Sequence, residues 1–361
     1  MKLRTECSGL FLLYVSVYAE SMKIQENISL KKWATFRTGG NARYFVRVKN
    51  TKELKEALGF SQRSDLRNFV LGKGANTLVS DQGYFGLIIR MEIKGILIDE
   101  KSKNAVRVTV GAGEDWDTLV GKMVRRKFTG LENLSYIPGT VGAAAFGNIG
   151  AYGVEAKDII SSVEALNTET MKIKKFSNEE CAFGYRESFF KTKDGNKYII
   201  TKVIFDLKKN GMLKTDYKDV QEYFEKKKII SPTSKNLRDA IIEIRKNKLP
   251  DIAIVGTAGS FFKNPIVSKR KAEELKKEYP GLPLYFSAEG KTKLPAGYLL
   301  DRICGIKGYK KGNVGTWEKQ ALCLVNYGNA TTKEILEFAE EVKEKVQKKT
   351  GIVLEMEVQI L

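Results

Sequence analysis

With 361 residues, 42% of them apolar, the chain is long enough to bury two or three hydrophobic cores and is not a disordered protein. It contains no histidine, which excludes Ser-His-Asp and Cys-His catalysis and HExxH zinc sites, so any proton transfer must use Ser, Tyr, Cys, Lys or a carboxylate. The formal net charge of +19 favours anionic partners such as nucleotides, nucleic acid or an acidic membrane surface, although scattered lysines on a solvated surface explain it more simply.

The N-terminus carries an apolar run, residues 9–19, behind Lys2 and Arg4, and this pattern resembles a signal peptide. The run is too short to span a membrane as a helix. Met22 follows it almost at once, so we expect an over-extended start site, with export as the alternative. The four cysteines show no CxxC spacing, which favours reduced thiols in a cytoplasmic protein, and no metal site is predicted.

The first half of the chain predicts short strands separated by glycine turns, with few helices. An alternating strand ends at Val48, and a helical pattern behind a Thr cap follows over Thr51–Phe60. Further strands are predicted at residues 69–71, 106–113, 162–176 and 198–207, and a further helix at residues 115–126. This order of elements favours an α+β domain up to about residue 207.

The second half of the chain is more helical. Residues 234–248 carry apolar side chains at helical spacing. Residues 256–265 predict a turn-rich loop around Ser260. A second helix is predicted from Thr331, which has capping-box spacing to a glutamate three residues later, to Gly351, which can end the helix.

The last residues of the chain alternate strictly between apolar and polar and predict a final strand. Glu355 and Glu357 share its polar face, where two carboxylates are usually just solvated. The opposite face carries the apolar residues Ile352, Leu354, Met356 and Val358. From the residues alone, neither glutamate is distinguished from an ordinary surface side chain.

Two glycine-rich stretches point to anion binding. Gly72 and Gly74 form a turn after a short strand, but Thr77 replaces the third glycine of a dinucleotide fingerprint, and no Walker lysine follows. Residues 130–155 are rich in glycine, and no charged residue occurs over residues 133–154. Such a stretch can cradle a phosphate-bearing cofactor through backbone N–H groups, or it can be a tightly packed crossover. The two readings are equally supported by the stretch alone.

Taken in order, nine motifs resemble one family, the UDP-N-acetylenolpyruvoylglucosamine reductases of peptidoglycan-precursor synthesis. They are TFRTGGNA, LGKGANTLVSD, GLENLSYIPGTVG, NIGAYGVE, FGYRESFFK, AGSFFKNP, KLPAGYLLD, ALCLVN and LEMEV, from about Leu30 to the C-terminus. The resemblance implies a two-subdomain FAD-binding fold of the vanillyl-alcohol oxidase type, followed by a smaller α+β substrate domain. We therefore expect an N-terminal extension over 1–27, an FAD-binding domain over 28–207 and a substrate-binding domain over 208–361.

The reaction implied by the resemblance is two hydride transfers through non-covalent FAD. NADPH reduces the flavin, and hydride from flavin N5 then reaches C3 of the enolpyruvyl group of a UDP-sugar. Ser260 of the AGS motif would protonate C2, Arg186 would fork onto the substrate carboxylate, and Glu357 would orient the enol. Glu355 would stay solvated or structural.

The resemblance also implies binding residues. Helix N-termini and backbone nests would supply N–H donors to the flavin pyrophosphate. The cofactor contacts would be Gly72, Gly74, Ala75, Asn76, Gly139, Thr140, Gly142, Asn148, Gly150, Ala151 and Tyr152. The substrate contacts would be Tyr185, Tyr217, Arg245, Lys248 and Asn264. Tyr217 matches the tyrosine of a mobile loop in the longer form of the family, and closure of this loop would exclude water.

Four positions depart from the family pattern: Phe146, Gly147, Ala75 and Tyr298. The first two put one side-chain contact to the flavin in doubt. The alternatives are a flavin oxidase on the same fold, a family member that binds without catalysing, and a basic nucleic-acid-binding module, which lacks any recognisable motif. We expect a cytoplasmic monomer with no nucleic-acid partner and no stable membrane association.

Overall fold

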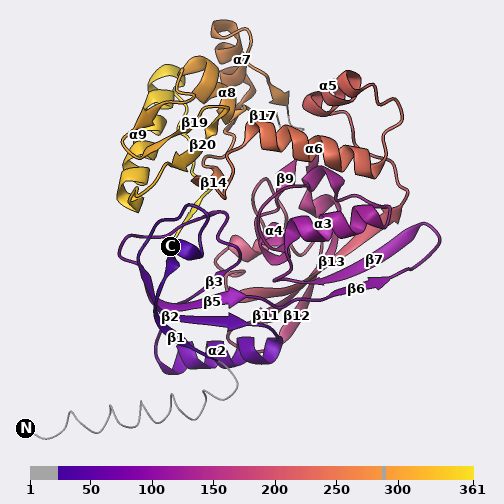
Figure 1. The fold of residues 1–361 in the computed structure, drawn as a ribbon, viewed down its shortest axis with the longest axis vertical. Helices are drawn as coiled ribbons and strands as arrows, with labels where there is room; N and C mark the ends of the chain where they lie inside the picture. The colour runs from indigo at the N-terminus through magenta and orange to yellow at the C-terminus, as the bar shows by residue number, and fades with distance from the viewer. Residues whose placement is uncertain (1–22, 287–289) are drawn as a thin grey trace, which may run out of the picture. The chain divides into compact units, whose positions relative to one another are not determined.

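The structure, a computed structural model, describes residues 23–286 and 290–361, and its elements form two compact units (Figure 1). The first unit runs up to Ile28 and continues through Asn41–Gly72 and Tyr84–Arg238. The second unit consists of Ser29–Gly40, Lys73–Gly83 and Asp239–Leu361. Mixed helices and strands in both units confirm the predicted α+β class. The apolar run at 9–19 lies outside the described residues, and within them no helix is long and apolar enough to cross a membrane.

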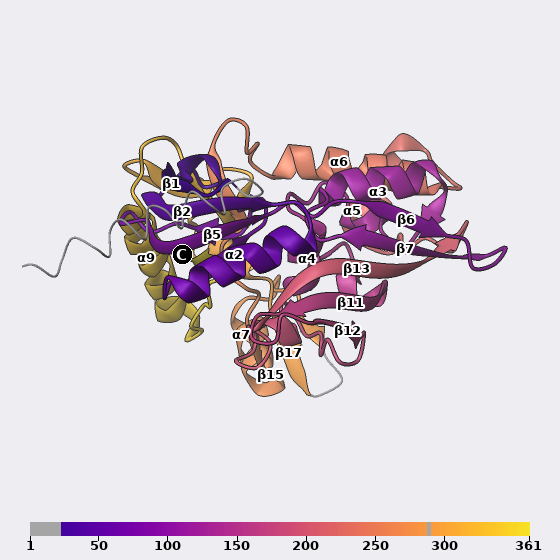
Figure 2. The ribbon, with the colours of Figure 1, turned by 90° about the horizontal axis from the view of Figure 1, so that it is seen from below.

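The first unit begins with a four-stranded sheet in the order β1-β2-β5-β3. Its strands are β1 (Gln25–Ser29), β2 (Asn41–Val48), β5 (Tyr84–Met91) and β3 (Asn68–Leu71). β5 pairs in parallel with both β2 and β3. Helix α2 (Thr51–Arg63) covers this sheet (Figures 1 and 2), and its Leu54, Ala57 and Leu58 are buried in the same core as the strand residues. The predicted helix is confirmed, but Asn50, not Thr51, accepts the capping hydrogen bond from the Glu53 N–H.

A six-stranded sheet forms the rest of the first unit, in the order β12-β11-β13-β7-β6, with β8 also paired to β13. The strands are β6 (Ile96–Asp99), β7 (Ala105–Gly111), β8 (Phe128–Thr129), β11 (Ile160–Asn167), β12 (Ile173–Ser177) and β13 (Tyr198–Lys209). Helix α3 (Trp116–Arg125) confirms the helix predicted over 115–126; Trp116 is fully buried in this core, and the Asp115 side chain caps the helix by accepting the Thr118 N–H. The remaining elements are α4 (Val141–Phe146), β9 (Gly150–Ala151), β10 (Val154–Glu155) and α5 (Lys218–Lys227).

Helix α6 (Ser234–Lys248) has the predicted bounds, and the chain enters the second unit within it. The main sheet of that unit has the order β14-β20-β19-β18. Its strands are β14 (Gly256–Ser260), β20 (Gln320–Asn326), β19 (Val314–Trp317) and β18 (Lys310–Lys311). Helix α9 (Thr332–Thr350) packs on this sheet through a stripe of buried apolar residues. The predicted capping box of Thr331 and Glu334 and the left-handed stop at Gly351 are both confirmed.

The other elements of the second unit are short. A three-stranded sheet has the order β15-β17-β16, and a parallel pair joins β4 to β21. These strands are β15 (Ile266–Ser268), β17 (Lys291–Lys293), β16 (Tyr285–Phe286), β4 (Thr77–Leu78) and β21 (Gln359–Ile360). The helices are α7 (Lys269–Glu278) and α8 (Ala296–Tyr298).

The final segment alternates between buried and exposed side chains as predicted, but most of it does not form the predicted strand. Ile352, Leu354 and Val358 are buried, while Val353 and Glu355 are exposed. Only β21 at the end of the segment forms a strand, because the preceding residues meet their neighbours through isolated main-chain bonds.

The predicted domains, 28–207 for FAD and 208–361 for substrate, are defined by the ligand that each would bind. The two compact units are defined instead by which residues pack together, and each contains separate stretches of the chain. The domain boundaries therefore stay a prediction.

A charged cluster attaches α9 to the β18–β19 hairpin. Glu341 accepts bonds from Lys311 Nζ at 2.8 Å, Lys345 Nζ at 2.8 Å and the Tyr309 hydroxyl at 3.0 Å. The Lys311 ammonium, followed by that of Lys345, lowers the pKa of Glu341 to about 2. A depressed carboxyl pKa contributes stability above its unfolded value of 4.5 and loses that contribution as the pH falls toward 2.

We expect Glu341→Gln to lower the free energy of unfolding at neutral pH by about 1 kcal/mol or less, because the cluster is partly exposed. The difference from wild type should shrink as the pH falls from 4.5 toward 2. Urea titrations over this range measure it. Glu340→Gln is the control, because Glu340, on the same helix, pairs with Lys343 and not with the Lys311 and Lys345 cluster. A difference that does not change with pH would contradict the assignment.

Candidate active site

Ser260 lies at the end of β14, at a bulge. Thr257 pairs with Val325 and Ser260 pairs with Cys323, so β14 has one more residue than β20 between these pairs. Gly259 adopts a φ of +73°, and a Cβ on it would meet nothing within 4 Å. Such bulges re-aim a side chain next to many active sites. The loop predicted for residues 256–265 therefore begins as a strand, and the half-exposed Ser260 hydroxyl has no hydrogen-bond partner among the described residues.

The main chain after Ser260 runs beside the C-terminal segment. The Glu357 N–H donates to the Phe261 carbonyl at 2.8 Å, and the Lys263 N–H donates to the Glu355 carbonyl at 2.8 Å. Lys263 Nζ also forms an ion pair of 2.6 Å with Glu355, whose side chain is 71% exposed. Glu355 thus has a structural role at the surface. The Glu357 main chain is bonded to Phe261, the residue that follows Ser260, so the second unit brings two of the three predicted catalytic residues to neighbouring segments.

Two positively charged side chains act on the strand partner of Ser260. Burial raises the pKa of the Cys323 thiol, opposite Ser260, to about 12, and the charges of Arg245 and Lys248 act in the opposite direction. The thiol is therefore neutral at physiological pH and is not a nucleophile. Arg245 and Lys248, predicted to bind the substrate diphosphate, belong to the same unit as Ser260 and are close enough to influence its strand partner.

Two predicted binding asparagines hold main-chain groups. Asn264 Oδ1 accepts the N–H of Ala296 at 2.9 Å. Asn76 Nδ2 donates to the Glu357 carbonyl at 3.0 Å. Each side chain therefore stabilises a loop of the second unit. Their contacts with substrate and FAD stay predictions.

In the first unit, Tyr185 and Arg186 occupy the central positions of a tight turn. The N–H groups of Gly184 and Glu187 donate to each other's carbonyls at 2.9 and 3.2 Å. Arg186 has a φ of +58°, which is uncommon for a residue with a side chain and concentrates at functional sites. Arg186 Nη2 donates to the Gly150 carbonyl at 3.2 Å. The strained turn thus presents Arg186 against the glycine-rich stretch.

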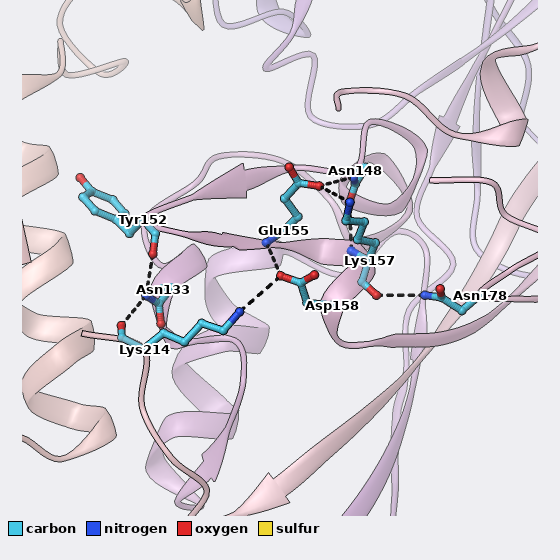
Figure 3. A network of polar contacts seen from close by, with 8 residues as sticks. All are labelled: Asn133, Asn148, Tyr152, Glu155, Lys157, Asp158, Asn178 and Lys214. Atoms are coloured by element: carbon cyan, nitrogen blue, oxygen red, sulfur yellow. Dashed lines mark hydrogen bonds and ion pairs between the residues drawn. The ribbon is translucent and has the colours of Figure 1, made fainter. Parts of the chain in front are cut away.

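Asn148, within the glycine-rich stretch, bonds to this turn and also to Glu155 and Lys157; Figure 3 shows the last two contacts. Its Nδ2 donates to the Gly184 carbonyl at 2.7 Å and to Glu155 Oε2 at 2.9 Å. Its Oδ1 accepts the Lys157 N–H at 2.9 Å. Asn148 is only 1% exposed, and both of its amide hydrogens are used within the protein. The structure therefore gives it the role of positioning the loop, and its predicted contact with FAD stays untested.

The N–H groups within the first turn of α4 are bonded inside the protein and are not the donors expected there. Thr140 Oγ1 accepts the Ala143 N–H at 3.4 Å, and the Gly142 N–H donates to the Ala112 carbonyl at 2.9 Å. A Cβ on Gly142 would lie 2.8 Å from the Ala112 Cβ, and one on Gly72 would lie 2.8 Å from Thr140 Oγ1. These glycines permit close packing, so an anion must find its donors elsewhere.

Such donors exist at two places. Among the described residues, no acceptor is found for the backbone N–H groups of Gly139 and Thr140 in the first unit, or of Gly74, Ala75 and Asn76 in the second. Gly139 has a φ of +149°, and a Cβ on it would meet nothing within 4 Å. Unpaired N–H groups at such glycine turns bind phosphate oxygens. Each set of donors, taken by itself, fits a phosphate group of the kind that FAD carries.

Asn133 is a residue that the motif analysis missed. It is 1% exposed, and its Nδ2 donates to the carbonyls of Tyr152 and Lys214, each at 2.9 Å (Figure 3). The rings of Tyr152 and Tyr217 are in edge contact with centroids 5.1 Å apart, and Lys214 Nζ lies 3.8 Å from Asp158. The segment before α5 is thereby docked on the glycine-rich stretch. An asparagine in an uncharged run could have indicated this role from the sequence, because a buried amide must find hydrogen-bond partners.

Comparison with known proteins identifies the family. The chain is 42% identical over 341 residues to the UDP-N-acetylenolpyruvoylglucosamine reductase of Flavobacterium johnsoniae, which covers 94% of this chain and 100% of that protein. It is 40% identical to the same reductase of Pseudomonas aeruginosa, covering 93% of this chain and 98% of that protein. The chain belongs to the UDP-N-acetylenolpyruvoylglucosamine reductase family.

Sequence profiles and a solved structure agree with this membership. The C-terminal domain of UDP-N-acetylenolpyruvoylglucosamine reductase matches residues 251–361, and an FAD binding domain matches residues 42–176. The crystal structure of UDP-N-acetylenolpyruvylglucosamine reductase from Thermus caldophilus superposes with a TM-score of 0.65 at 27% identity, covering 94% of this chain and 99% of that one. The chain is therefore an enzyme, an FAD-binding oxidoreductase, and the predicted family and fold are confirmed.

The backbone does not account for the glycine at position 147, where the chain departs from the pattern of the reductase family. Gly147 has a φ of −93°, and a Cβ on it would lie an ordinary 3.5 Å from the Ala143 carbonyl oxygen. The position therefore tolerates a side chain, and the fold does not require glycine there. Phe146 is half-buried, with Lys191 Nζ 5.7 Å from its ring centroid.

We expect Asn133→Ala to release the segment before α5, because two buried carbonyls lose their donor at a cost of about 2 kcal/mol. Tryptic cleavage at Lys214 should become faster than in wild type, and peptides covering residues 210–217 should exchange amide hydrogens faster.

Asn178→Ala is a matched control. Asn178 Nδ2 also donates to two carbonyls, those of Lys157 and Ile160, but it does not contact the 210–217 segment. Equal sensitivity at Lys214 in both variants would show that general destabilisation, not the Asn133 clamp, controls the segment.

Proposed function

We propose that this chain reduces UDP-N-acetylglucosamine enolpyruvate to UDP-N-acetylmuramate, using NADPH as the hydride donor and non-covalent FAD as the carrier. The observation that carries the proposal is the main-chain bond from Glu357 to Phe261, which holds Glu357 beside the segment of Ser260 in a chain that belongs to the reductase family. The absence of histidine excludes a histidyl link to the flavin.

The backbone N–H groups of Gly139 and Thr140 would donate to a phosphate of FAD. The other predicted FAD contacts are Gly74, Ala75 and Asn76 in the second unit and Gly150, Ala151 and Tyr152 in the first. When bound, FAD supplies hydride from N5 to C3 of the enolpyruvyl group after accepting it from NADPH. Every other step depends on side chains of this chain.

Ser260 would donate the proton that C2 requires. A serine hydroxyl is a weak acid in water, but transfer to a strongly basic enolate is favourable where nearby positive charge stabilises the alkoxide that remains. Arg245 and Lys248 supply positive charge close to the strand partner of Ser260. Glu357, held next to Phe261, would orient the enol.

The other proposed contacts recognise the substrate. Arg186, presented by its strained turn, would form two hydrogen bonds with the substrate carboxylate, and Tyr185 would position it. Arg245, Lys248 and Asn264 would bind the diphosphate and uridine. Tyr217, next to Tyr152, would close over the sugar nucleotide and exclude water.

A visible spectrum of the purified protein tests the proposal. The flavin band should bleach on anaerobic addition of NADPH and return, without oxygen, when the enolpyruvyl sugar nucleotide is added. A colourless protein that does not take up FAD would refute the assignment. Bleaching without return would retain the flavin site and refute the roles given to Ser260, Arg186 and Glu357.

We expect Ser260→Ala to leave NADPH-dependent bleaching at the wild-type rate and to slow the return of the band by on the order of a thousandfold, since one positioned acid contributes roughly 10²–10⁴ to a rate. Stopped-flow spectroscopy measures both steps separately. Equal losses in the two steps would show that Ser260 is structural.

A further inference from the structure

The main chain of Glu357 is held from both sides. Its N–H donates to the Phe261 carbonyl at 2.8 Å, and its carbonyl accepts Asn76 Nδ2 at 3.0 Å. The carbonyl of Asn76 in turn accepts the Gln359 N–H at 3.1 Å. One asparagine, 281 positions earlier in the chain, therefore makes two bonds to the segment that carries Glu357.

These two bonds extend a very short ladder. β4 and β21 pair in parallel over only two residues each, from Thr77 to Gln359 and from Leu78 to Ile360. Glu357 precedes β21 in the chain, so it lies outside the regular strand pairing. Asn76 precedes β4 directly, so its carbonyl continues the ladder by main-chain bonding, and its side-chain amide reaches Glu357 beyond it.

We propose that Asn76 is a positioning residue that sets the place of Glu357 relative to Ser260. The inference rests on the proposed function, which gives Glu357 its role at the enol. Phe261 links the register of Glu357 to Ser260, and Asn76 prevents the opposite edge of the segment from moving away. Sequence resemblance places Asn76 among the FAD contacts. In the structure its side chain is bonded to Glu357, and its backbone N–H is left to bind an anion.

This division makes a sharp test possible, because Asn76→Ala removes the side-chain amide and leaves the backbone N–H in place. FAD affinity and the rate of bleaching by NADPH should stay at wild-type values. The return of the flavin band on adding the enolpyruvyl sugar nucleotide should slow by on the order of tenfold, because small displacements of a catalytic group are costly. Asn76→Asp keeps the shape but presents an oxygen to the Glu357 carbonyl, and it should slow the return at least as much.

Asn41→Ala is the matched control, because Asn41 is also exposed and its Nδ2 also makes one hydrogen bond, to Asn27 Oδ1 at 2.9 Å. It should leave both steps unchanged. Amide exchange over residues 355–361 should be faster in Asn76→Ala than in wild type or Asn41→Ala. This readout reports the position of the segment independently of turnover.

Glu357→Gln distinguishes a failure of the role proposed for Asn76 from a failure of the role proposed for Glu357. It should slow the return step, and the double variant Asn76→Ala/Glu357→Gln should be no slower than Glu357→Gln alone, because both changes affect one group. Wild-type return in Asn76→Ala, with slow return in Glu357→Gln, would overturn this inference and leave the proposed function standing. Loss of FAD affinity in Asn76→Ala would overturn it by making the side chain a cofactor contact. Wild-type return in Glu357→Gln would refute the role of Glu357 and the inference with it.

Discussion

The hydrogen bond from the Glu357 N–H to the Phe261 carbonyl is the contact on which the candidate chemistry depends most directly. A serine hydroxyl becomes a useful acid only in a fixed environment, and Ser260 immediately precedes the residue that accepts this bond. The bulge at Gly259 determines where Ser260 leaves the regular strand pattern. Short main-chain bonds between distant segments thus position the two groups, without a long strand between them.

The glycines of the candidate cofactor site serve two different purposes. Gly142 and Gly74 allow the backbone to pass close to other parts of the chain, because a Cβ on them would lie 2.8 Å from the Ala112 Cβ and 2.1 Å from the Trp33 carbonyl oxygen. Gly139 instead borders open space in a conformation that favours glycine. Packing therefore requires the first two, whereas Gly139 alone keeps room for a bound group.

Asparagine side chains stabilise the irregular segments of both units. Asn133, Asn148 and Asn178 each give both amide hydrogens to acceptors within the first unit, and Asn76 holds the C-terminal segment of the second. Loops without regular hydrogen bonding leave carbonyls that must be paired when buried. Primary amides suit this task because they carry two donors and no charge. These neutral amides thus act beside the ion pairs of Lys263 with Glu355 and of Lys214 with Asp158 in ordering the candidate site.

The sequence by itself predicted several of the helices, because their hydrogen bonds and caps join residues close together in the chain. The apolar spacing of residues 234–248 and the capping box of Thr331 predicted α6 and the start of α9, because helical bonds join residues close in sequence. The ordered motifs also identified the family. The strand at Gly256–Ser260, the irregular final segment, and the partners of Asn76 and Asn133 were decided only by the tertiary structure. Each of these depends on a hydrogen bond to a residue far away in the chain, and no local pattern specifies which distant carbonyl a given amide will meet.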